Sequence, residues 1–385
     1  HTFDMMKASV IFVLILQLVG CVYSLVSRKN IRDDNEFNLV GRFALSAQNT
    51  YQATWPYSGV KFNIEGQNTT SRVYVSFGSC TADCEYFVEA HVDCSPVQKF
   101  EVNATSTSIV LDLATSVGQS YEIQFRKLTE SSNGNAKGVI EFGEIFLEGA
   151  TLIPLKKAAT LQNQNHNCLH RHKLLVIGDS ITAAYGVDAA NPCQFSAATE
   201  NEEHSYAVLV AQQVQAELHV VAWSGKGVVR NYGDVNPTST EPMPTYYNRT
   251  LATSPFTSDP AGGNYWSPSA FPADIVLVML GTNDYSTQPT PSDEQFISGL
   301  VDLLHRIGAD YPQAKGHVAA MCAPMQTGRQ CANIATAAQQ AGVNYVFIDP
   351  DVFTGGYGCD GHPNAQTQQL MANIVTPAVK TMLNE

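Results

Sequence analysis

The stretch Lys173-Leu-Leu-Val-Ile177, which runs directly into Gly178-Asp179-Ser180, decides the expected fold of the second half of the chain. After the lysine it is continuously apolar, and strands that are apolar on both faces belong to a parallel sheet covered on both sides. Further runs of the same kind follow, and segments with helical periodicity lie between them. This alternation predicts a doubly wound α/β domain.

The other elements of this half follow from the same pattern. In open parallel sheets ligands bind at the carboxyl ends of the strands, so the residues that follow each strand are the candidates for a site. We predict further strands at Leu218–Ala222, Asp274–Leu280, His317–Met321 and Asn344–Ile348, and helices at Ser205–Leu218, Asp293–Ile307, Asn333–Ala341 and Ala365–Leu383.

The first half of the chain, from Phe37 to Leu147, consists of short alternating segments separated by Gly, Asn, Ser and Pro. Regularly spaced short strands are typical of a β-sandwich or jelly roll. The polar stretch Gln162–Asn167 separates the two patterns and marks the expected domain boundary. We therefore expect an all-β accessory domain over residues 25–165 and the α/β domain over residues 170–385. The predicted β-strands are Arg72–Phe77, Tyr86–Val92, Ser108–Leu113, Tyr121–Phe125 and Val139–Leu147.

The amino-terminal residues 1–24 have the features of a leader and secretory signal peptide. Lys7 precedes the apolar run Ala8–Gly20, and cleavage after Ser24 fits the small residues there. A transmembrane anchor is the alternative, but the run is shorter than the ~20 apolar residues that a span needs. We expect a secreted, extracellular protein that is not held in a membrane once the signal is removed.

Cysteine content and charge agree with an extracellular setting. An even number of cysteines remains after signal removal, so disulfides are expected, and the three Asn-x-Thr acceptor sequences indicate a glycoprotein. Cys322 and Cys331 bracket a short loop and are the predicted pair, whereas the pairing of the other cysteines stays open. The net charge of -13, without any Lys/Arg run, argues against a nucleic-acid partner.

Four polar segments carry the candidate chemistry, and three of them directly follow predicted strands. Ser180 ends the first strand, where its hydroxyl is exposed as a nucleophile at the start of a helix. Gly225 brings a backbone N–H close to a substrate and Asn283 offers an amide donor, so together they predict an oxyanion hole. His362, fixed by the following Pro363, is the predicted base.

These segments resemble the four blocks of the SGNH (GDSL-type) hydrolases: Gly178-Asp-Ser180, Gly225, Gly281-Thr-Asn283 and His362. The chain looks closer still to carbohydrate esterase family two, on the stretches Trp223–Tyr232, Met243–Thr250 and Cys359–Asn364. The resemblance implies a flavodoxin-like three-layer α/β/α domain behind a jelly roll. It also implies a serine esterase that removes acetyl groups from polysaccharide and needs no cofactor. Its implied partner is an acetylated carbohydrate.

Asp360 is where this sequence departs from the family pattern. Most SGNH enzymes place the triad Asp three residues before the His, but that position is Cys359 here and Asp360 lies two before His362. In an extended backbone alternate residues share a face, so Asp360 would reach the far imidazole nitrogen. We predict this triad. A turn at Gly361 would instead leave a backbone carbonyl to orient His362, in a Ser-His dyad.

Aromatic residues near the expected crevice are candidates for sugar binding, because flat rings pack on the apolar faces of sugars. Trp266 is the first candidate, followed by Trp223 and Tyr232. No metal site is expected, because the remaining histidines, including His91, have no ligand spacing with carboxylates. Two other functions remain open: a catalytically idle carbohydrate-binding protein, and a lipase or thioesterase with a broad apolar cleft.

Overall fold

The computed structural model describes residues 26–31, 35–46, 50–78, 84–131, 138–161, 170–253 and 264–385. The predicted signal peptide, residues 1–24, lies outside this described part, and so does the polar stretch that contains the predicted domain boundary. Among the helices of the described residues, none is both long enough and apolar enough to cross a membrane.

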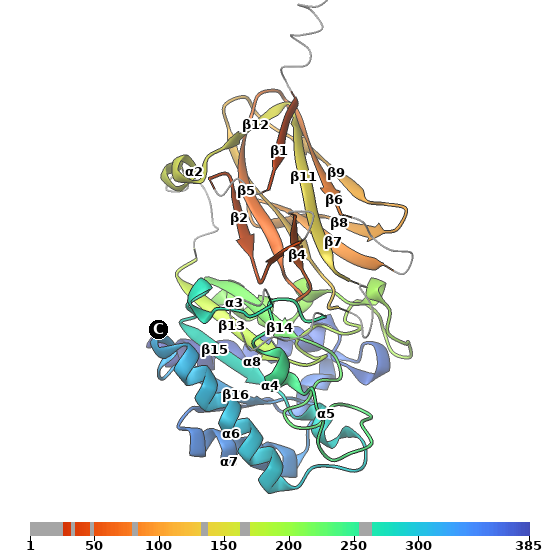
Figure 1. Cartoon of the computed structure of the whole chain (residues 1–385), viewed down its shortest axis with the longest axis vertical. Helices are drawn as coiled ribbons and strands as arrows, with labels where there is room; N and C mark the ends of the chain where they lie inside the picture. Colours follow the sequence, from red (N-terminus) through yellow and green to blue (C-terminus); the bar gives the residue numbers. More distant parts are fainter. Residues whose placement is uncertain are drawn as a thin grey trace, which may run out of the picture.

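The amino-terminal part is a β-sandwich, as predicted, and forms the upper half of the molecule in Figure 1. Its described residues make two antiparallel six-stranded sheets. One sheet contains β1 (Val26–Asn30), β3 (Ala44–Leu45), β4 (Tyr51–Ala53), β6 (Thr70–Phe77), β9 (Ser108–Ala114) and β11 (Ile140–Glu148). The other contains β2 (Phe37–Val40), β5 (Gly59–Gly66), β7 (Glu85–Val92), β8 (Ser95–Asn103), β10 (Ser120–Lys127) and β12 (Ala150–Ile153).

Alternation along the strands builds the sandwich core. In β6 the residues Val73, Val75 and Phe77 point inward, while their neighbours are partly or fully exposed. They pack with Phe62 and Phe125 of the facing sheet in one buried cluster. The five strands predicted for this half correspond to β6, β7, β9, β10 and β11, so these predictions are confirmed.

The carboxy-terminal part is the predicted three-layer α/β/α domain. Its five described strands are parallel, in the order β14-β13-β15-β16-β17, which is the flavodoxin-like order. The strands are β13 (His172–Gly178), β14 (Ala216–Ala222), β15 (Ile275–Met279), β16 (Val318–Cys322) and β17 (Asn344–Phe347). The α-helices after the sandwich are α2 (Leu155–Leu161), α3 (Tyr206–Gln213), α4 (Met243–Tyr246), α5 (Thr282–Ser286), α6 (Asp293–Asp310), α7 (Gly328–Ala341) and α8 (Ala365–Leu383). Short 3-10 turns are η1 (Ala197–Thr199), η2 (Glu202–His204), η4 (Pro268–Ala270), η5 (Pro312–Ala314), η6 (Pro350–Gly355) and η7 (Cys359–Gly361).

Helices cover both faces of this sheet. Side chains of α6 and α7 share one buried cluster with β15 and β16, and side chains of α3 and α8 share another on the opposite face. One helix prediction is wrong at its end: Ser205–Leu218 was expected, but α3 stops at Gln213. Gln215 adopts a left-handed φ of 52°, which ends the helical path before β14 begins.

Buried polar side chains connect the sandwich to the α/β domain. The Arg42 guanidinium donates to the carbonyls of Tyr247 (2.5 Å) and Arg249 (3.0 Å), and the Trp55 indole donates to Arg249 as well. Arg126 of β10 binds Glu203 of η2 at 3.0 Å.

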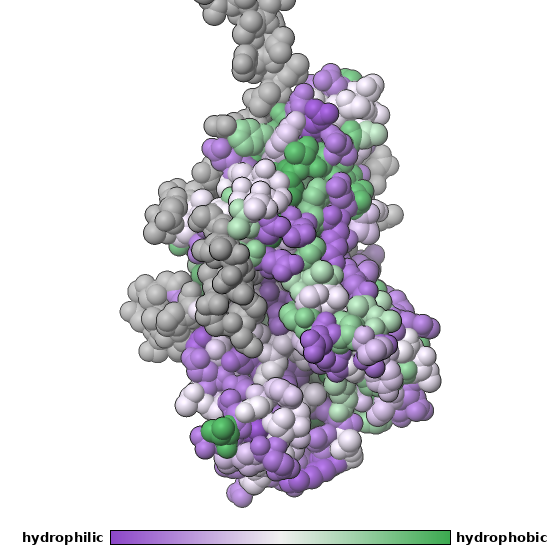
Figure 2. Space-filling view, turned by 90° about the vertical axis from the view of Figure 1, so that its right-hand side faces the viewer, coloured by the Kyte–Doolittle hydropathy of each residue, from purple (hydrophilic) through white to green (hydrophobic). Residues whose placement is uncertain are grey.

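On the face seen in Figure 2, apolar surface gathers on the sandwich half, whereas the α/β half is mostly hydrophilic.

Candidate active site

Ser180 and His362 lie within hydrogen-bonding distance at the carboxyl end of β13. The His362 Nε2 atom is 2.8 Å from the Ser180 Oγ atom, which is the geometry of a nucleophile and its base. Ser180 is 5% exposed. The residues after it form consecutive turns rather than the predicted helix, so Ser180 does not lie at a helix N-terminus. Burial lowers the pKa of His362, which favours the neutral imidazole that a general base requires.

The Asp360 carboxylate does not bind His362, contrary to our prediction. Its Oδ2 atom accepts hydrogen bonds from the Tyr185 hydroxyl at 2.7 Å and from the Phe195 N–H at 3.1 Å. The segment Cys359–Gly361 is a 3-10 turn in which Asp360 has a φ of 51°, so the extended backbone assumed from sequence is absent there. The two side chains therefore do not share a face.

The imidazole of His362 is held by other groups. The Tyr185 ring stacks on it with centroids 4.2 Å apart, and the Phe195 ring stacks on Tyr185 in turn at 4.4 Å. The backbone carbonyls of Cys359 and Asp360 lie close enough to raise the pKa of His362 against the effect of burial. The buried Nδ1 atom makes no well-directed hydrogen bond within the described part of the chain.

The turn after β14 carries Gly225, which has a φ of +80°, a conformation that favours glycine. The carbonyl of Gly225 accepts from the Tyr232 N–H at 2.8 Å, and the Lys226 carbonyl accepts from the Asn283 amide at 2.8 Å. Among the described residues no acceptor is bonded to the Gly225 N–H. This donor is therefore available for an oxyanion.

Asn283 is buried at the start of α5, where β15 ends. Its Nδ2 atom also lies 3.3 Å from the Asp179 carboxylate, and burial raises the pKa of this Asp179 to about 7. The structure thus brings Ser180, Gly225 and Asn283 to the carboxyl ends of three neighbouring strands, β13, β14 and β15, and His362 reaches Ser180 from the segment before α8. The Asn283 amide lies between two acceptors.

Asp284 is a buried residue that the sequence interpretation left without a role. Its carboxylate accepts the N–H groups of Val228 (2.9 Å), Val229 (2.8 Å) and Arg230 (2.9 Å), and burial raises its pKa to about 6. It therefore fixes the loop that continues from the Gly225 turn. In the sequence, only the position of Asp284 directly after Asn283 indicated this role.

Two disulfides are described in the α/β domain. The predicted Cys322–Cys331 pair is confirmed. The second bond, Cys193–Cys359, was not predicted; it joins the loop before η1 to the residue that opens the 3-10 turn before His362. Cys84 and Cys94 are disulfide-bonded too.

The three aromatic candidates differ in their surroundings. Trp266 packs against Arg42 and His219, toward the amino ends of β13 and β14, so the structure places it away from Ser180. Trp223 is buried and packs edge-on against Trp55 and Tyr246. Tyr232, in contrast, is 62% exposed and its Cβ atom lies beside Gly225.

Outside this site, Glu89, His91 and Glu203 lie close enough to one another to hold a metal ion. The sequence spacing did not show this, because Glu203 comes from the other half of the chain. The Arg126 guanidinium binds both oxygens of Glu203, at 3.0 and 3.3 Å, and already supplies a cation there. The cluster is therefore explained as an ion-pair network between the two domains.

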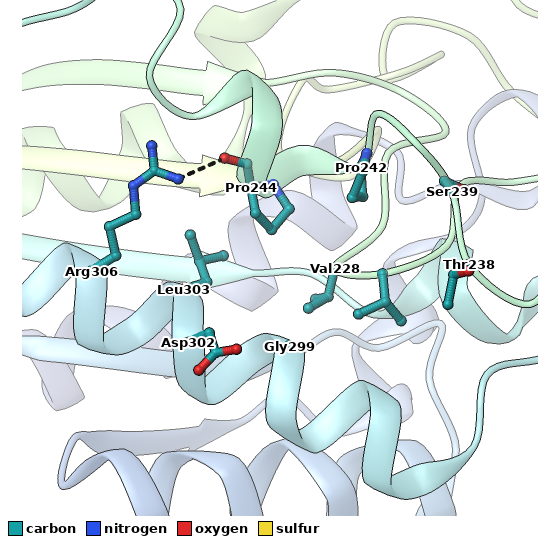
Figure 3. A pocket seen from close by; sticks show the side chains of 10 residues that line it. Val228, Thr238, Ser239, Pro242, Pro244, Gly299, Asp302, Leu303 and Arg306 are labelled. Atoms are coloured by element: carbon teal, nitrogen blue, oxygen red, sulfur yellow. Dashed lines mark hydrogen bonds between the residues drawn. The ribbon is translucent and has the colours of Figure 1, made fainter. Parts of the chain in front are cut away.

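A hollow of about 330 Å³ lies between α6 and the loop that follows the Gly225 turn. Figure 3 shows Val228 and Leu303 in its wall and the hydrogen bond from Arg306 to the Pro244 carbonyl, which is 3.1 Å long. Neither Ser180 nor His362 lines it, so this hollow is separate from the Ser180–His362 pair.

Comparison with curated proteins gives two informative relatives. The cellulase/esterase CelE of Acetivibrio thermocellus is 29% identical over 89% of this chain, which spans 39% of the length of CelE. An acetylxylan esterase / glucomannan deacetylase of Cellvibrio japonicus is 22% identical over 86% of this chain and 85% of its own length.

Among solved structures, a family two carbohydrate esterase from Clostridium thermocellum in complex with cellohexaose is similar. It is 27% identical with a TM-score of 0.71, over 90% of this chain and 99% of its own. The sequence model of the GDSL-like lipase/acylhydrolase family matches residues 176–370, which include the Ser180, Gly225, Asn283 and His362 segments. This chain therefore belongs to the GDSL-like lipase/acylhydrolase family.

Proposed function

We propose that this chain is a secreted carbohydrate esterase that removes O-acetyl groups from polysaccharide or oligosaccharide by serine acyl transfer. The observation that carries this proposal is the 2.8 Å approach of His362 Nε2 to Ser180 Oγ, beside the unbonded Gly225 N–H and the Asn283 amide. A nucleophile, a base and two oxyanion donors are the parts that acyl transfer needs.

The reaction proceeds in two steps. His362 Nε2 takes the Ser180 hydroxyl proton while Oγ attacks the acetyl carbonyl carbon. The resulting oxyanion accepts from the Gly225 and Ser180 N–H groups and from the Asn283 amide, which gives up its 3.3 Å contact with Asp179 to donate. The imidazolium then gives its proton to the departing sugar oxygen, which leaves an acetyl group on Ser180. Water, deprotonated by His362, attacks this ester and releases acetate.

In this proposal Ser180 and His362 work as a dyad. Asp360 acts on the imidazole through Tyr185, which holds its hydroxyl against the carboxylate and its ring against His362. The stacked ring and the nearby negative charge both favour the imidazolium that forms in the transition state.

A carbohydrate substrate is supported by the relatives and by the surface beside the site. Their names include acetylxylan esterase, glucomannan deacetylase and a family two carbohydrate esterase in complex with cellohexaose. The exposed ring of Tyr232 beside Gly225 offers a flat surface for a sugar. Secretion is proposed on the predicted signal peptide and fits the disulfides of the described residues.

The test compares acetate release from acetylated xylan and acetylated glucomannan with phenol release from an aryl ester of a long-chain acid. We expect release from at least one polysaccharide and much slower cleavage of the long-chain ester. Ser180→Ala, prepared in the same way, is the control and should release nothing above background. Preference for the long-chain ester would contradict the proposal and indicate a lipase.

A further inference from the structure

Glu130 belongs to the β-sandwich, yet its side chain reaches the turn that carries Gly225. It lies just beyond β10 and is 7% exposed. Its Oε2 atom accepts a hydrogen bond of 2.5 Å from the N–H of Ser224, the residue immediately before Gly225. A residue of the accessory domain thus contacts the backbone of the oxyanion turn directly.

The hydrogen bond from Ser224 to Glu130 adds to two others that hold this turn. The Gly225 and Lys226 carbonyls are held by the Tyr232 N–H and the Asn283 amide, both from the α/β domain. The Ser224 N–H is held only by Glu130 among the described residues. Glycine has wide backbone freedom, so the direction of the Gly225 N–H depends on how its flanking peptide groups are fixed.

The segment that carries Glu130 is itself well anchored. The buried Lys127 ammonium donates to the carbonyls of Thr129 and Glu130, and the Ser131 hydroxyl donates to the Thr54 carbonyl at 2.9 Å. The carboxylate therefore projects from a rigid support. Burial raises the pKa of Glu130 to about 7, and its bond to Ser224 opposes that rise.

We propose that Glu130 is a positioning residue for ester hydrolysis, through which the β-sandwich completes the oxyanion hole of the α/β domain. The inference rests on the proposed serine esterase function and assigns the accessory domain a direct part in it. Glu130 does not touch the reacting atoms, so its effect passes through the Ser224–Gly225 backbone.

The experiment compares Glu130→Ala and Glu130→Gln in the full chain on an aryl acetate. Losing a charge-assisted hydrogen bond to the turn should lower kcat by about 10- to 100-fold in Glu130→Ala with little change in KM. Glu130→Gln retains an acceptor oxygen and should recover most of the loss. A phenylboronic acid, which adds to Ser180 as a tetrahedral anion, should lose affinity for Glu130→Ala in parallel with kcat/KM.

Glu203→Gln is the matched control, because it removes a buried charge from the same domain interface without touching Ser224. Its kcat should stay within about twofold of the parent. An equal loss in Glu203→Gln would mean that general domain docking, and not Glu130, sets the rate. An unchanged kcat in folded Glu130→Ala, or a change in KM alone, would also overturn the inference.

Two further points keep the outcome interpretable. If Glu130→Ala does not fold, Glu130→Asp carries the same expectation, because its shorter side chain withdraws the acceptor from Ser224. Failure of the proposed function is recognised separately: the parent itself would then show no Ser180-dependent hydrolysis, whereas failure of this inference leaves the parent fully active.

Discussion

The turn that carries Gly225 and the segment that carries His362 lie beside the same proposed nucleophile, Ser180, but are held in different ways. Buried side chains hold the first: Glu130 and Asp284 accept its backbone N–H groups, and Asn283 donates to Lys226. The second is held by the Cys193–Cys359 disulfide and by the ring of Tyr185.

The difference fits what each segment does in the proposed acyl transfer. An oxyanion hole works when its donors are fixed before charge develops, and buried hydrogen bonds supply that rigidity. In the proposed mechanism, the imidazole must instead gain and lose a proton while its Nε2 atom stays near Ser180. A covalent tie and a stacked ring hold its place without using the nitrogen that reacts. Removing a side chain on the Gly225 side and removing the disulfide on the His362 side should therefore lower activity by different amounts.

The largest effect is expected on the oxyanion side, from Asn283→Ala. Removing a donor that acts mainly in the transition state should lower kcat by ~10²- to 10³-fold and leave KM nearly unchanged. Steady-state kinetics on an aryl acetate measure both constants. A rise in KM with an unchanged kcat would make Asn283 a substrate-binding residue instead.

A smaller effect is expected from loss of the disulfide on the histidine side. The Cys193→Ser, Cys359→Ser double variant should lose about tenfold in kcat/KM, because the 3-10 turn before His362 is no longer tied to its neighbouring loop. The Cys322→Ser, Cys331→Ser double variant is the control and should lose thermal stability while its kcat/KM stays within about twofold. Equal activity losses in both would indicate a general effect of disulfide removal.

The fold was readable from sequence because its signals are local. Continuous apolar runs identified the strands of the parallel sheet, and alternation identified five strands of the sandwich. β5 was overlooked even though Val60, Phe62 and Ile64 alternate with polar residues. The candidate nucleophile, donors and base could be named because each of their segments borders a strand or helix and resembles a family block.

The contacts around those residues could not be read in the same way. Glu130 reaches the site only through tertiary packing. Tyr185 lies in the turn after Ser180, where its N–H donates to the Ser180 carbonyl at 3.0 Å, but no local pattern marks either residue. Asp360 was misplaced because alternate residues share a face only in extended backbone, whereas this segment turns. Trp266 was misplaced because a loop that precedes a strand in sequence packs near the strand's amino end, away from the site.

A modest effect is expected from Asp360→Asn, since the carboxylate acts through the Tyr185 hydroxyl. We expect kcat/KM to fall by less than about tenfold, well below the ~10⁴-fold loss seen when a direct triad carboxylate is disrupted. Tyr185→Phe removes the same hydrogen bond but keeps the ring, so it should match Asp360→Asn. A loss of a hundredfold or more in kcat/KM for Asp360→Asn would instead support Asp360 as a direct triad carboxylate.

The smallest effect concerns pH near neutrality. His362 must be neutral to accept the Ser180 proton, so kcat/KM falls as pH drops through the pKa of His362. Burial lowers this pKa below the usual ~6.5, and between pH 7 and pH 8 kcat/KM should change by less than about 1.5-fold. A pH profile with its acidic midpoint above 6.5 would show that burial does not control this histidine.

The most direct test of the central claim is to find the covalent intermediate. The parent protein is mixed with an aryl acetate, quenched in acid within one turnover, digested and analysed by peptide mass spectrometry. The account predicts an acetyl group on the peptide that contains Ser180, at the Ser180 side chain, and no acetylated peptide in Ser180→Ala or His362→Ala treated identically. Acetate release by the parent with the acetyl group on another residue, or undiminished turnover by Ser180→Ala, would contradict it.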